Sequence, residues 1–306
     1  MSLVEISHLT KTYGRVKAVE DFSLSVEKGE IVALVGPDGA GKTSVFRAAC
    51  GLITFDAGRI SVAGLDVSRE FERLKPRLGY MSQTFSLYQD LSVDENLDFY
   101  AGLFGVTGAE LKRKKQVLYQ FSNLEPFRGR RAGRLSGGMK QKLSLSCTLI
   151  HDPEVLVLDE PTTGVDPVSR QQFWSILKDL KARGSTILVS TPYMDEVALS
   201  DRAAFVYGGR VLGEGTPGQL VKRFRGRVYR MEAPLAAGTF DRLAAIRELG
   251  ARRFGSAVYF YTGPGKSFAD FHERLAALGI RAEMTTEVEP SLEDAFIDLM
   301  AMGAAQ

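Results

Sequence analysis

The segment from Ile31 to Ser44, with the sequence IVALVGPDGAGKTS, constrains the fold of this chain more than any other stretch. It opens with an apolar, β-branched run that predicts a strand buried on both faces. Three glycines and then an apolar helical pattern follow. Strand, glycine-rich turn and helix, with the spacing G-x4-G-K-[ST], predict a phosphate-binding loop. The alternative, a glycine-rich turn with a chance Lys-Thr pair, leaves the flanking strand and helix unexplained.

Each part of this loop has a physical reason to hold phosphate. The glycines let the backbone approach the phosphates and turn its N–H groups toward them. The helix that begins near Lys42 directs the positive end of its dipole at the same charge. Lys42 can reach the β- and γ-phosphates, and the Thr43 hydroxyl can ligate Mg²⁺. The predicted nucleotide-binding residues of the loop are Gly36, Pro37, Asp38, Gly39, Ala40, Gly41, Lys42, Thr43 and Ser44.

A second apolar strand ends in two carboxylates. Residues 154–160 read EVLVLDE, so that Asp159 and Glu160 follow four apolar residues. Open α/β sheets place their ligands at this carboxyl edge. Asp159 suits Mg²⁺ held through water, and Glu160 suits a general base that polarises the attacking water. The alternative is that the two carboxylates cap the following helix.

Three further features have open interpretations. Tyr13, expected in the connection between the strands at 3–6 and 22–26, could stack on a nucleotide base or pack in the core. Gln83, at the end of a predicted strand at 80–83, could ligate Mg²⁺, position a water or lie on the surface. Ser136, Gly137 and Gly138 open a helix that runs to Ile150, which predicts either an anion site or only a flexible helix start.

Length and composition set the broad class of the protein. The 306 residues predict about two domains of ~150 residues. Apolar content of 44% and charged content of 25% are ordinary for a soluble globular protein, and a net charge of +2 gives no reason to expect nucleic acid as a partner. No apolar run approaches the ~18 residues of a membrane span, and no secretory signal is visible. Cys50 and Cys147 predict buried thiols in a reducing compartment, so we expect a cytosolic protein.

The pattern along the chain predicts its organisation. Residues 3–6 and 22–26 alternate like strands of a small antiparallel sheet beside the parallel one. Residues 92–123 show only helical patterns, with a capping box at Ser92 and Glu95, and lie in a helical subdomain of about 84–140. The basic stretch 112–115 has no interleaved aromatics, so we interpret it as a solvated helix face rather than a nucleic-acid site.

A boundary near Arg223 to Arg227 divides the chain into predicted domains 1–224 and 225–306. The second domain is a small α+β unit without an evident catalytic constellation. Its predicted strands are 228–231, 257–261 and 281–288, and its predicted helices are 240–249, 268–278 and a last one from residue 292. Capping boxes precede the last two helices, at Ser267 with Asp270 and at Ser291 with Asp294.

With these motifs in their order, residues 3 to 220 resemble the nucleotide-binding subunit of ABC transporters. The loop at 36–43 resembles Walker A, Gln83 the Q-loop, residues 155–160 Walker B, residues 164–167 with Asp166 the D-loop, and Tyr13 the aromatic A-loop. The family signature is matched by Leu135, Ser136, Gly137, Gly138 and Met139. The resemblance implies an α/β P-loop NTPase (RecA-like) core that binds ATP and Mg²⁺. It also implies Thr43, Gln83 and Asp159 at the Mg²⁺, Glu160 as catalytic base, base stacking for Tyr13, and a phosphate role for Ser136.

Within that family the chain looks like bacterial ABC-2 type multidrug exporters and is similar to YbhF-type ATPases, in which two such cassettes work together. The stretches YMSQTFSLYQDLSVDENLDFYAGL, LSGGMKQKLSLSCTLIHDP and PSLEDAFIDLM carry this likeness. It implies a second nucleotide-binding domain, identical or different, that meets the first head to tail. It implies ABC-2 type permease subunits docked on the helical subdomain, at the cytoplasmic face of the bacterial inner membrane. The C-terminal domain would then serve regulation or dimerisation.

Two positions depart from the family pattern. The switch His is expected two residues after Ser190, where this chain has Pro192, which offers neither a side-chain hydrogen bond nor a proton-transfer group. Asp38 replaces the more usual Asn and either faces the phosphates or turns outward. Pro192 predicts slow turnover at this chain's own site, although Glu160 alone could suffice. A regulatory nucleotide-binding module and a soluble ABC ATPase acting on ribosomes or DNA remain the competing functions.

Overall fold

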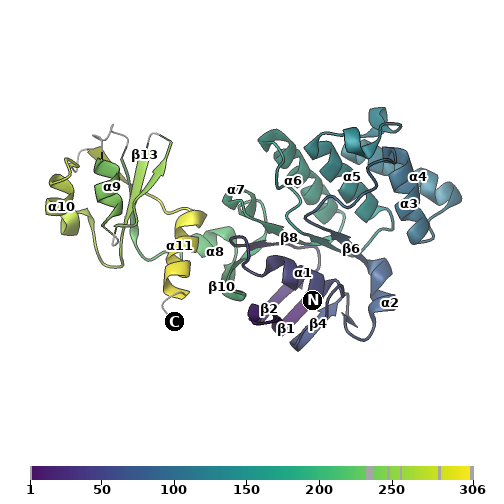
Figure 1. Cartoon of the computed structure of the whole chain (residues 1–306), viewed down its shortest axis with the longest axis horizontal. Helices are drawn as coiled ribbons and strands as arrows, with labels where there is room; N and C mark the ends of the chain where they lie inside the picture. The colour runs from purple at the N-terminus through teal and green to yellow at the C-terminus, as the bar shows by residue number, and fades with distance from the viewer. Residues whose placement is uncertain (1, 232–237, 247–248, 256, 282–283, 304–306) are drawn as a thin grey trace. The chain divides into compact units, whose positions relative to one another are not determined.

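The computed structural model describes residues 2–231, 238–246, 249–255, 257–281 and 284–303 (Figure 1). Its internal contacts divide the chain into two compact units, Met1–Pro217 and Gly218–Gln306. The division at residue 224 that the sequence suggested stays a prediction. Among the helices of the described ranges, none is long and apolar enough to cross a membrane.

A six-stranded sheet forms the centre of the first unit, with the order β10-β9-β3-β8-β7-β6. Every strand pair from β9 to β6 is parallel, and β10 joins β9 as an antiparallel hairpin. All residues of β3, β7 and β8 are buried, as expected for parallel strands covered on both faces. The strands are β3 (Ile31–Val35), β6 (Leu78–Met81), β7 (Val155–Leu158), β8 (Thr186–Thr191), β9 (Arg202–Tyr207) and β10 (Arg210–Gly215).

A second sheet in this unit has the order β2-β1-β4-β5 and is antiparallel, as predicted. Its strands are β1 (Ser2–Tyr13), β2 (Val16–Glu27), β4 (Ala57–Val62) and β5 (Leu65–Asp66). Tyr13 is the last residue of β1, opposite Val16, and the expectation that it lies in the connection is wrong. Register shifts between Ile6 and Lys11 break the alternation of β1, so the sequence pattern revealed only its first part.

The helices of the first unit are α1 (Lys42–Ala49), α2 (Phe71–Leu74), α3 (Val93–Leu103), α4 (Gly108–Ser122), α5 (Gly137–Leu149), α6 (Pro167–Ala182) and α7 (Met194–Val197). Helices α3, α4 and α5 lie together (Figure 1), and α5 also contacts α6 and β6. The capping box of Ser92 and Glu95 opens α3, as predicted. The signature helix α5 also starts where the sequence predicts, with Ser136 as its N-cap.

The basic stretch on α4 is not a solvated face throughout, and that prediction is wrong for two of its lysines. Lys114 is 9% exposed and forms ion pairs with Glu110 at 3.0 Å and Asp152 at 3.1 Å. Lys115 pairs with two aspartates of α3, at 2.6 and 2.7 Å. Their acidic partners come mostly from other segments, which a local pattern does not show.

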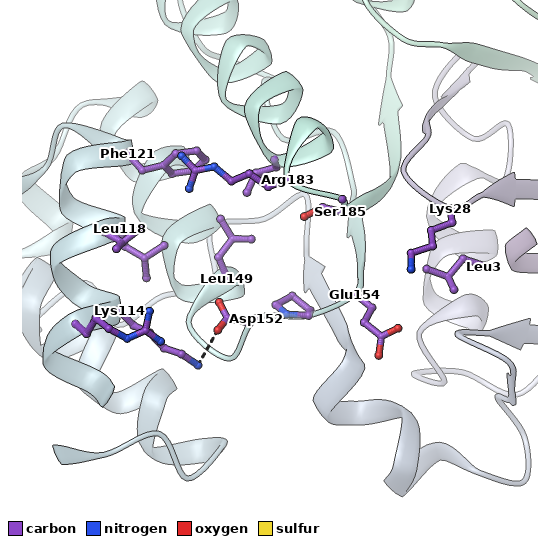
Figure 2. A pocket seen from close by; sticks show the side chains of 15 residues that line it. Leu3, Lys28, Lys114, Leu118, Phe121, Leu149, Asp152, Glu154, Arg183 and Ser185 are labelled. Carbon is purple, nitrogen blue, oxygen red and sulfur yellow. Dashed lines mark ion pairs between the residues drawn. The ribbon is translucent and has the colours of Figure 1, made fainter. Parts of the chain in front are cut away.

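Lys114 also lines a cavity of about 560 Å³ (Figure 2). Its walls come from α4, from the ends of α5 and α6, and from Asp152 and Glu154 just before β7. It therefore opens at the amino ends of β7 and β8, whereas the phosphate loop and both Walker B carboxylates follow the carboxyl ends of their strands.

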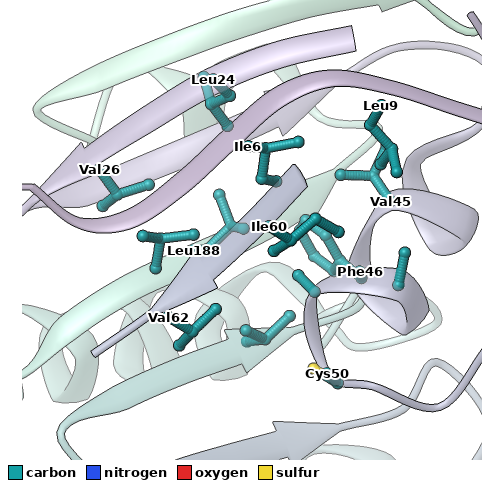
Figure 3. Packing of buried hydrophobic residues seen from close by; sticks show 14 of the residues in the cluster. Ile6, Leu9, Leu24, Val26, Val45, Phe46, Cys50, Ile60, Val62 and Leu188 are labelled. Atoms are coloured by element: carbon teal, nitrogen blue, oxygen red, sulfur yellow. The ribbon is translucent and has the colours of Figure 1, made fainter. Parts of the chain in front are cut away.

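The core between the two sheets fixes the helix that follows the phosphate loop. Val45 and Phe46 of α1 are fully buried and belong to one apolar cluster with Ile6, Ile60 and Leu188 (Figure 3). Burying a side chain of this size contributes about 1.5–3 kcal/mol. Because α1 is held from both sheets, the loop at its start has a rigid base.

The second unit contains a four-stranded antiparallel sheet with the order β12-β13-β11-β14. Its apolar core includes Tyr229, Leu243, Phe260 and Leu275. The two predicted capping boxes are present, at Ser267 and at Ser291. The elements are β11 (Arg227–Met231), β12 (Arg252–Phe254), β13 (Ala257–Thr262), β14 (Thr285–Val288), α9 (Thr239–Ala244), a 3-10 turn (Phe268–Phe271), α10 (His272–Ala276) and α11 (Leu292–Gly303); α8 (Pro217–Val221) crosses the boundary between the units.

Several predicted bounds in this unit are wrong. The helix expected at 240–249 ends at Ala244, and residues 247–248 of it lie outside the described residues. The strand expected at 281–288 begins at Thr285, and residues 282–283 lie outside the described residues. Strand β12 was not expected, because three residues are too few to show a pattern.

Candidate functional site

The phosphate loop connects β3 to α1, and its geometry requires the glycines. Gly39 and Gly41 have positive φ angles of 79° and 100°. A Cβ on Gly36 would lie 2.1 Å from the carbonyl oxygen of Val206, and one on Gly41 would lie 2.3 Å from that of Ala18. Helix α1 begins at Lys42, as predicted.

Lys42 is the buried cation of this loop, with 4% of its surface exposed. Its Nζ donates to the carbonyl oxygens of Gly36, at 2.8 Å, and Pro37, at 3.1 Å. The same Nζ lies 3.2 Å from Oε1 of Glu160. The loop lysine and the second Walker B carboxylate therefore meet in one place, although 118 positions separate them (160 − 42).

Asp159 and Glu160 follow β7 and are buried, at 0% and 4% exposed. Ser190 connects them, because its Oγ donates to Oδ1 of Asp159 at 2.8 Å and accepts from the backbone N–H of Glu160 at 2.9 Å. Glu160 has a φ of +47°, a strained conformation for a non-glycine residue that is held by these contacts. The capping alternative is wrong, since Asp166 caps the next helix.

The surroundings of Asp159 fit a divalent cation. Burial raises the pKa of its carboxyl, while hydrogen bonding by Ser190 and Thr43 acts in the opposite direction. Its Oδ2 is buried and accepts no hydrogen bond within the described part of the chain. Buried polar atoms without a partner are rare, and a hard cation such as Mg²⁺ takes oxygen ligands of this kind. Thr43 and Asp159 are therefore placed together as a Mg²⁺ site requires.

Glu160 is oriented by two further side chains. Nε2 of Gln83 donates to its Oε2 at 3.0 Å, and Oγ1 of Thr163 donates to the same atom at 3.3 Å. Strand β6 ends at Met81, so Gln83 lies beyond the strand rather than in it. Sequence reasoning missed Thr163 and Ser190, although a Thr after the two carboxylates and a polar residue ending a buried strand are usable signals.

Tyr13 is 45% exposed, so the core-packing alternative is wrong. Its ring helps to line a cavity of about 340 Å³, together with Ala18, residues 38–44, Gln83 and Glu160. Ser44 Oγ donates to the Tyr13 hydroxyl at 3.4 Å. Asp38 is exposed and lines the same cavity, so it faces the phosphate region without being buried there. A cavity of this volume is in the range of small-ligand sites.

The signature segment lies next to the D-loop, not in this cavity. Ser136 caps α5 by accepting from the N–H of Met139 at 3.3 Å, and Leu135 before it is buried. A Cβ on Gly138 would lie 2.7 Å from Oγ of Ser169, in the first turn after Asp166. A Cβ on Gly137 would lie 3.6 Å from the carbonyl oxygen of Gly164 in the D-loop. None of the described signature residues lines the phosphate-loop cavity.

Pro192 follows β8 directly and is exposed. Strand β8 pairs in parallel with β3, and Thr191 is opposite Val35. Pro192 and Gly36 are therefore the first residues after two neighbouring strands. The nearest histidine in the sequence, His151, stacks on Phe104 of the helical part, with ring centroids 3.7 Å apart.

Comparison with known proteins places these motifs in a family. Residues 19–163 match the family described as ABC transporter. The chain is 40% identical over 290 residues to the probable multidrug ABC transporter ATP-binding protein YbhF of Escherichia coli (strain K12), covering 92% of this chain and 49% of that protein. It therefore spans about half the length of YbhF. It is 35% identical to the Nod factor export ATP-binding protein I of Paraburkholderia xenovorans (strain LB400), over 97% of this chain and 96% of that protein.

A solved structure described as the ATP-binding subunit of an ABC transporter has the same fold. Its TM-score is 0.67 at 30% sequence identity, covering 73% of this chain and 93% of that one. The predicted fold class, a P-loop core with an antiparallel sheet and a helical part, is confirmed.

Proposed function

The chain belongs to the family of ABC transporter ATP-binding subunits, and we propose that it binds MgATP in the phosphate-loop cavity and hydrolyses it to drive export through a separate membrane permease. The observation that carries this proposal is the pairing of Lys42 with Glu160 at one cavity, together with the buried, unpartnered Oδ2 of Asp159, the residue directly before Glu160. A cation for phosphate, a carboxylate for water and an oxygen for Mg²⁺ are the parts that phosphoryl transfer needs.

ATP binding begins with the base on the exposed ring of Tyr13, where stacking needs only a free π face. The phosphates lie on the backbone N–H groups from Gly36 to Ser44 and at the start of α1. Lys42 then exchanges its Glu160 partner for phosphate oxygens. Thr43, Asp159 and Gln83 would hold the Mg²⁺, which would neutralise part of the charge on the phosphates.

Hydrolysis rests on Glu160 as general base for the attacking water. Its carboxylate is buried and oriented by Gln83 and Thr163, so little reorientation is needed when the phosphate arrives. Release of Lys42 from Glu160 on ATP binding leaves the carboxylate to accept a proton. The charged pair thus changes partners within the site.

Two cassettes form the working unit in this proposal. Leu135 to Met139 and Asp166 lie beside each other but outside the chain's own cavity, which supports their action on the ATP of a second cassette. That cassette is a copy of this chain or a different one. The relative YbhF has about twice the length that this chain covers, which agrees with a pair of cassettes.

The membrane partner is a permease of the ABC-2 type. The helical part carries exposed apolar side chains at Tyr88, Phe99 and Leu103, which are 51%, 38% and 63% exposed, and the rings of Tyr88 and Phe99 are 4.7 Å apart. Such a patch suits a protein partner. We place the chain at the cytoplasmic face of the inner membrane, as the multidrug and export names of its relatives suggest. The C-terminal unit serves regulation or dimer contacts.

A second candidate is a nucleotide-binding regulatory subunit with little turnover of its own, which the exposed Pro192 favours. Calorimetry with MgATP and an ATPase assay on the purified chain decide between the two. Binding with steady hydrolysis supports the transport ATPase, and binding with almost none supports the regulatory subunit. Lys42→Ala removes the cation of the polyphosphate site and should abolish binding. Unchanged ATP affinity in that variant would contradict both.

A further inference from the structure

Glu196 is a buried carboxylate with no assigned role in the ATP site. It is 2% exposed and lies on α7, four residues after Pro192. Its Oε2 accepts from the hydroxyl of Thr162 at 3.0 Å and from that of Thr191 at 2.5 Å. A carboxylate is rarely buried without strong partners, because its desolvation is costly. Two hydroxyls, one from the turn after β7 and one from the end of β8, therefore converge on this one side chain.

Arg170 supplies the positive charge of the same cluster. Its Nη1 lies 3.8 Å from Oε1 of Glu196, and its Nη2 donates to Asp195 at 2.9 Å. The guanidinium also stacks over the ring of Tyr193, 4.0 Å from the centroid. Arginine is suited to this arrangement because its planar head pairs with carboxylates and stacks on rings at the same time.

The cluster joins three segments that act on ATP in the proposed function. Thr162 follows Glu160 by two residues, and Thr191 ends β8 directly before Pro192. Arg170 is in the first turn of α6, and its backbone N–H bonds to the carbonyl oxygen of Asp166 at 3.0 Å. One set of side-chain contacts thus joins three segments. They are the turn after the Walker B carboxylates, the segment from Thr191 to Glu196 (the switch loop), and helix α6, which follows the D-loop.

Pro192 explains why the switch loop needs such contacts. Proline has no N–H and no polar side chain, so residue 192 can donate no hydrogen bond that would hold the loop to a neighbour. The loop is held instead through Thr191, which accepts from the Tyr193 N–H at 3.1 Å, and through Glu196 and Arg170.

We propose that Arg170 and Glu196 are positioning residues that fix Glu160 and the D-loop for ATP hydrolysis through Thr162 and the switch loop. This inference rests on the proposed ATPase function. Neither side chain lines the phosphate-loop cavity in the described structure, so they act through other residues and not on ATP. Their loss should affect the rate of hydrolysis while ATP binding persists.

The test uses Arg170→Met, which keeps the length of the side chain and removes the guanidinium, and Glu196→Gln, which keeps its shape and removes the charge. Both should lower kcat by ~10²-fold, the effect of a misplacement of about 1 Å, with the Kd for ATP unchanged within about threefold. Arg170→Lys should recover part of the rate. The double variant should lose less than the product of the two single losses, because both changes break one cluster.

Arg77→Met is the matched control. Arg77 also pairs with a carboxylate, Glu154, at 2.5 and 2.9 Å, but at the amino end of β7. It should leave kcat unchanged. Hydrogen exchange provides a readout independent of activity: Arg170→Met should speed exchange in both 160–166 and 190–196, and Arg77→Met in neither.

The outcomes separate the two proposals. Wild-type rates and unchanged exchange in Arg170→Met and Glu196→Gln would overturn the positioning role and leave the ATPase function standing. A lowered melting temperature with no change in kcat would assign a structural role only and also overturn it. If the wild-type chain neither binds nor hydrolyses ATP, the proposed function fails, and the exchange result still decides whether the cluster holds the three segments.

Discussion

Nζ of Lys42 lies 3.2 Å from Oε1 of Glu160, and both side chains are almost fully buried. A buried pair of this kind is strongly destabilised when one partner is removed, because the other charge is left uncompensated. Lys42 keeps two carbonyl acceptors, and Glu160 keeps two donors, so each has alternatives when the pair separates. Lys42 and Glu160 can therefore separate when phosphate binds, because each charge keeps hydrogen-bond partners.

Glu160→Gln should keep ATP binding and lose hydrolysis. The amide retains the shape of the side chain but cannot accept the proton of the attacking water. Removal of a general base typically lowers the rate by ~10²–10⁴-fold, or about 3–5 kcal/mol of barrier. Calorimetry measures the binding, and phosphate release measures the turnover. The ATP-bound dimer of two Glu160→Gln cassettes should then remain intact and elute as a dimer in size-exclusion chromatography.

Glu154→Gln is the control for this change. Glu154 and Glu160 flank the same strand, β7, at its amino and carboxyl ends. Only the residue at the carboxyl end should matter for turnover. Hydrolysis at the wild-type rate by the Glu160→Gln protein would remove this carboxylate from the mechanism.

A chain truncated after Phe224 should still fold and bind ATP. The residues that line the phosphate-loop cavity all lie between Tyr13 and Glu160, within the first unit. The described residues of the second unit contribute none of them. The Kd for ATP should stay within about threefold of that of the full chain. A truncated chain with native circular dichroism that binds no ATP would show that the tail contributes to the site.

Because of His151, we expect the free energy of unfolding of the protein to be smaller in mild acid. Burial lowers the pKa of its ring below the ordinary 6.5, although the hydrogen bond from Nε2 to the carbonyl oxygen of Leu78, at 3.1 Å, acts the other way. The unfolded chain therefore binds a proton near pH 6.5 that the folded chain does not yet bind. The stabilisation is fully present above pH 6.5 and is lost as the pH falls from there to the folded-state pKa, by about 1.4 kcal/mol for each unit of difference.

His151→Phe removes this proton and keeps a ring to stack on Phe104. Urea unfolding at pH 7.5 and pH 5.5 should show a smaller difference for this variant than for the wild type. An equal pH dependence in both proteins would exclude His151 as its source.

The motifs of the site were predictable from sequence because their chemistry is local. Residues 31–49 form a continuous strand, turn and helix, and Asp159 and Glu160 directly follow one strand. Ser190 was not found, because its role depends on β8 lying beside β7. Its partner Glu160 lies 30 residues earlier in the chain. Glu196 was passed over for the same reason: its donors come from the turn after β7 and from the end of β8.

The fold was predictable to a similar extent. Buried parallel strands are continuous apolar runs and capped helices show clear periods, so β3, α3 and α5 begin where the sequence predicts. The end of β1 was missed because bulges interrupt its alternation, and Tyr13 was placed outside the strand as a result. Lys114 looked solvated because Asp152, one of its partners, lies 38 residues further along the chain (152 − 114).

Pro192→His should accelerate ATP hydrolysis by this chain if its own site is degenerate. Residue 192 follows Thr191, which is opposite Val35 in the parallel pair of β8 and β3. A side chain there starts beside Gly36, the first residue of the phosphate loop. Imidazole can hydrogen-bond a γ-phosphate and transfer a proton at neutral pH, and proline can do neither.

The expected gain is ~10²–10⁴-fold in kcat, the usual contribution of one acid–base group, with a smaller effect on ATP affinity because Gly36 to Thr43 supply most phosphate contacts. Pro192→Ala is the necessary control, since proline also restricts the backbone of Thr191 before it. A gain in Pro192→His alone assigns the effect to the imidazole.

Such a gain would also favour a heteromeric pair, in which the intact Ser136 to Gly138 and Asp166 of this chain complete a faster site on the partner cassette. Fast hydrolysis by the unmodified chain, with no further gain in Pro192→His, would instead show that Glu160 suffices and that two copies of this chain work together.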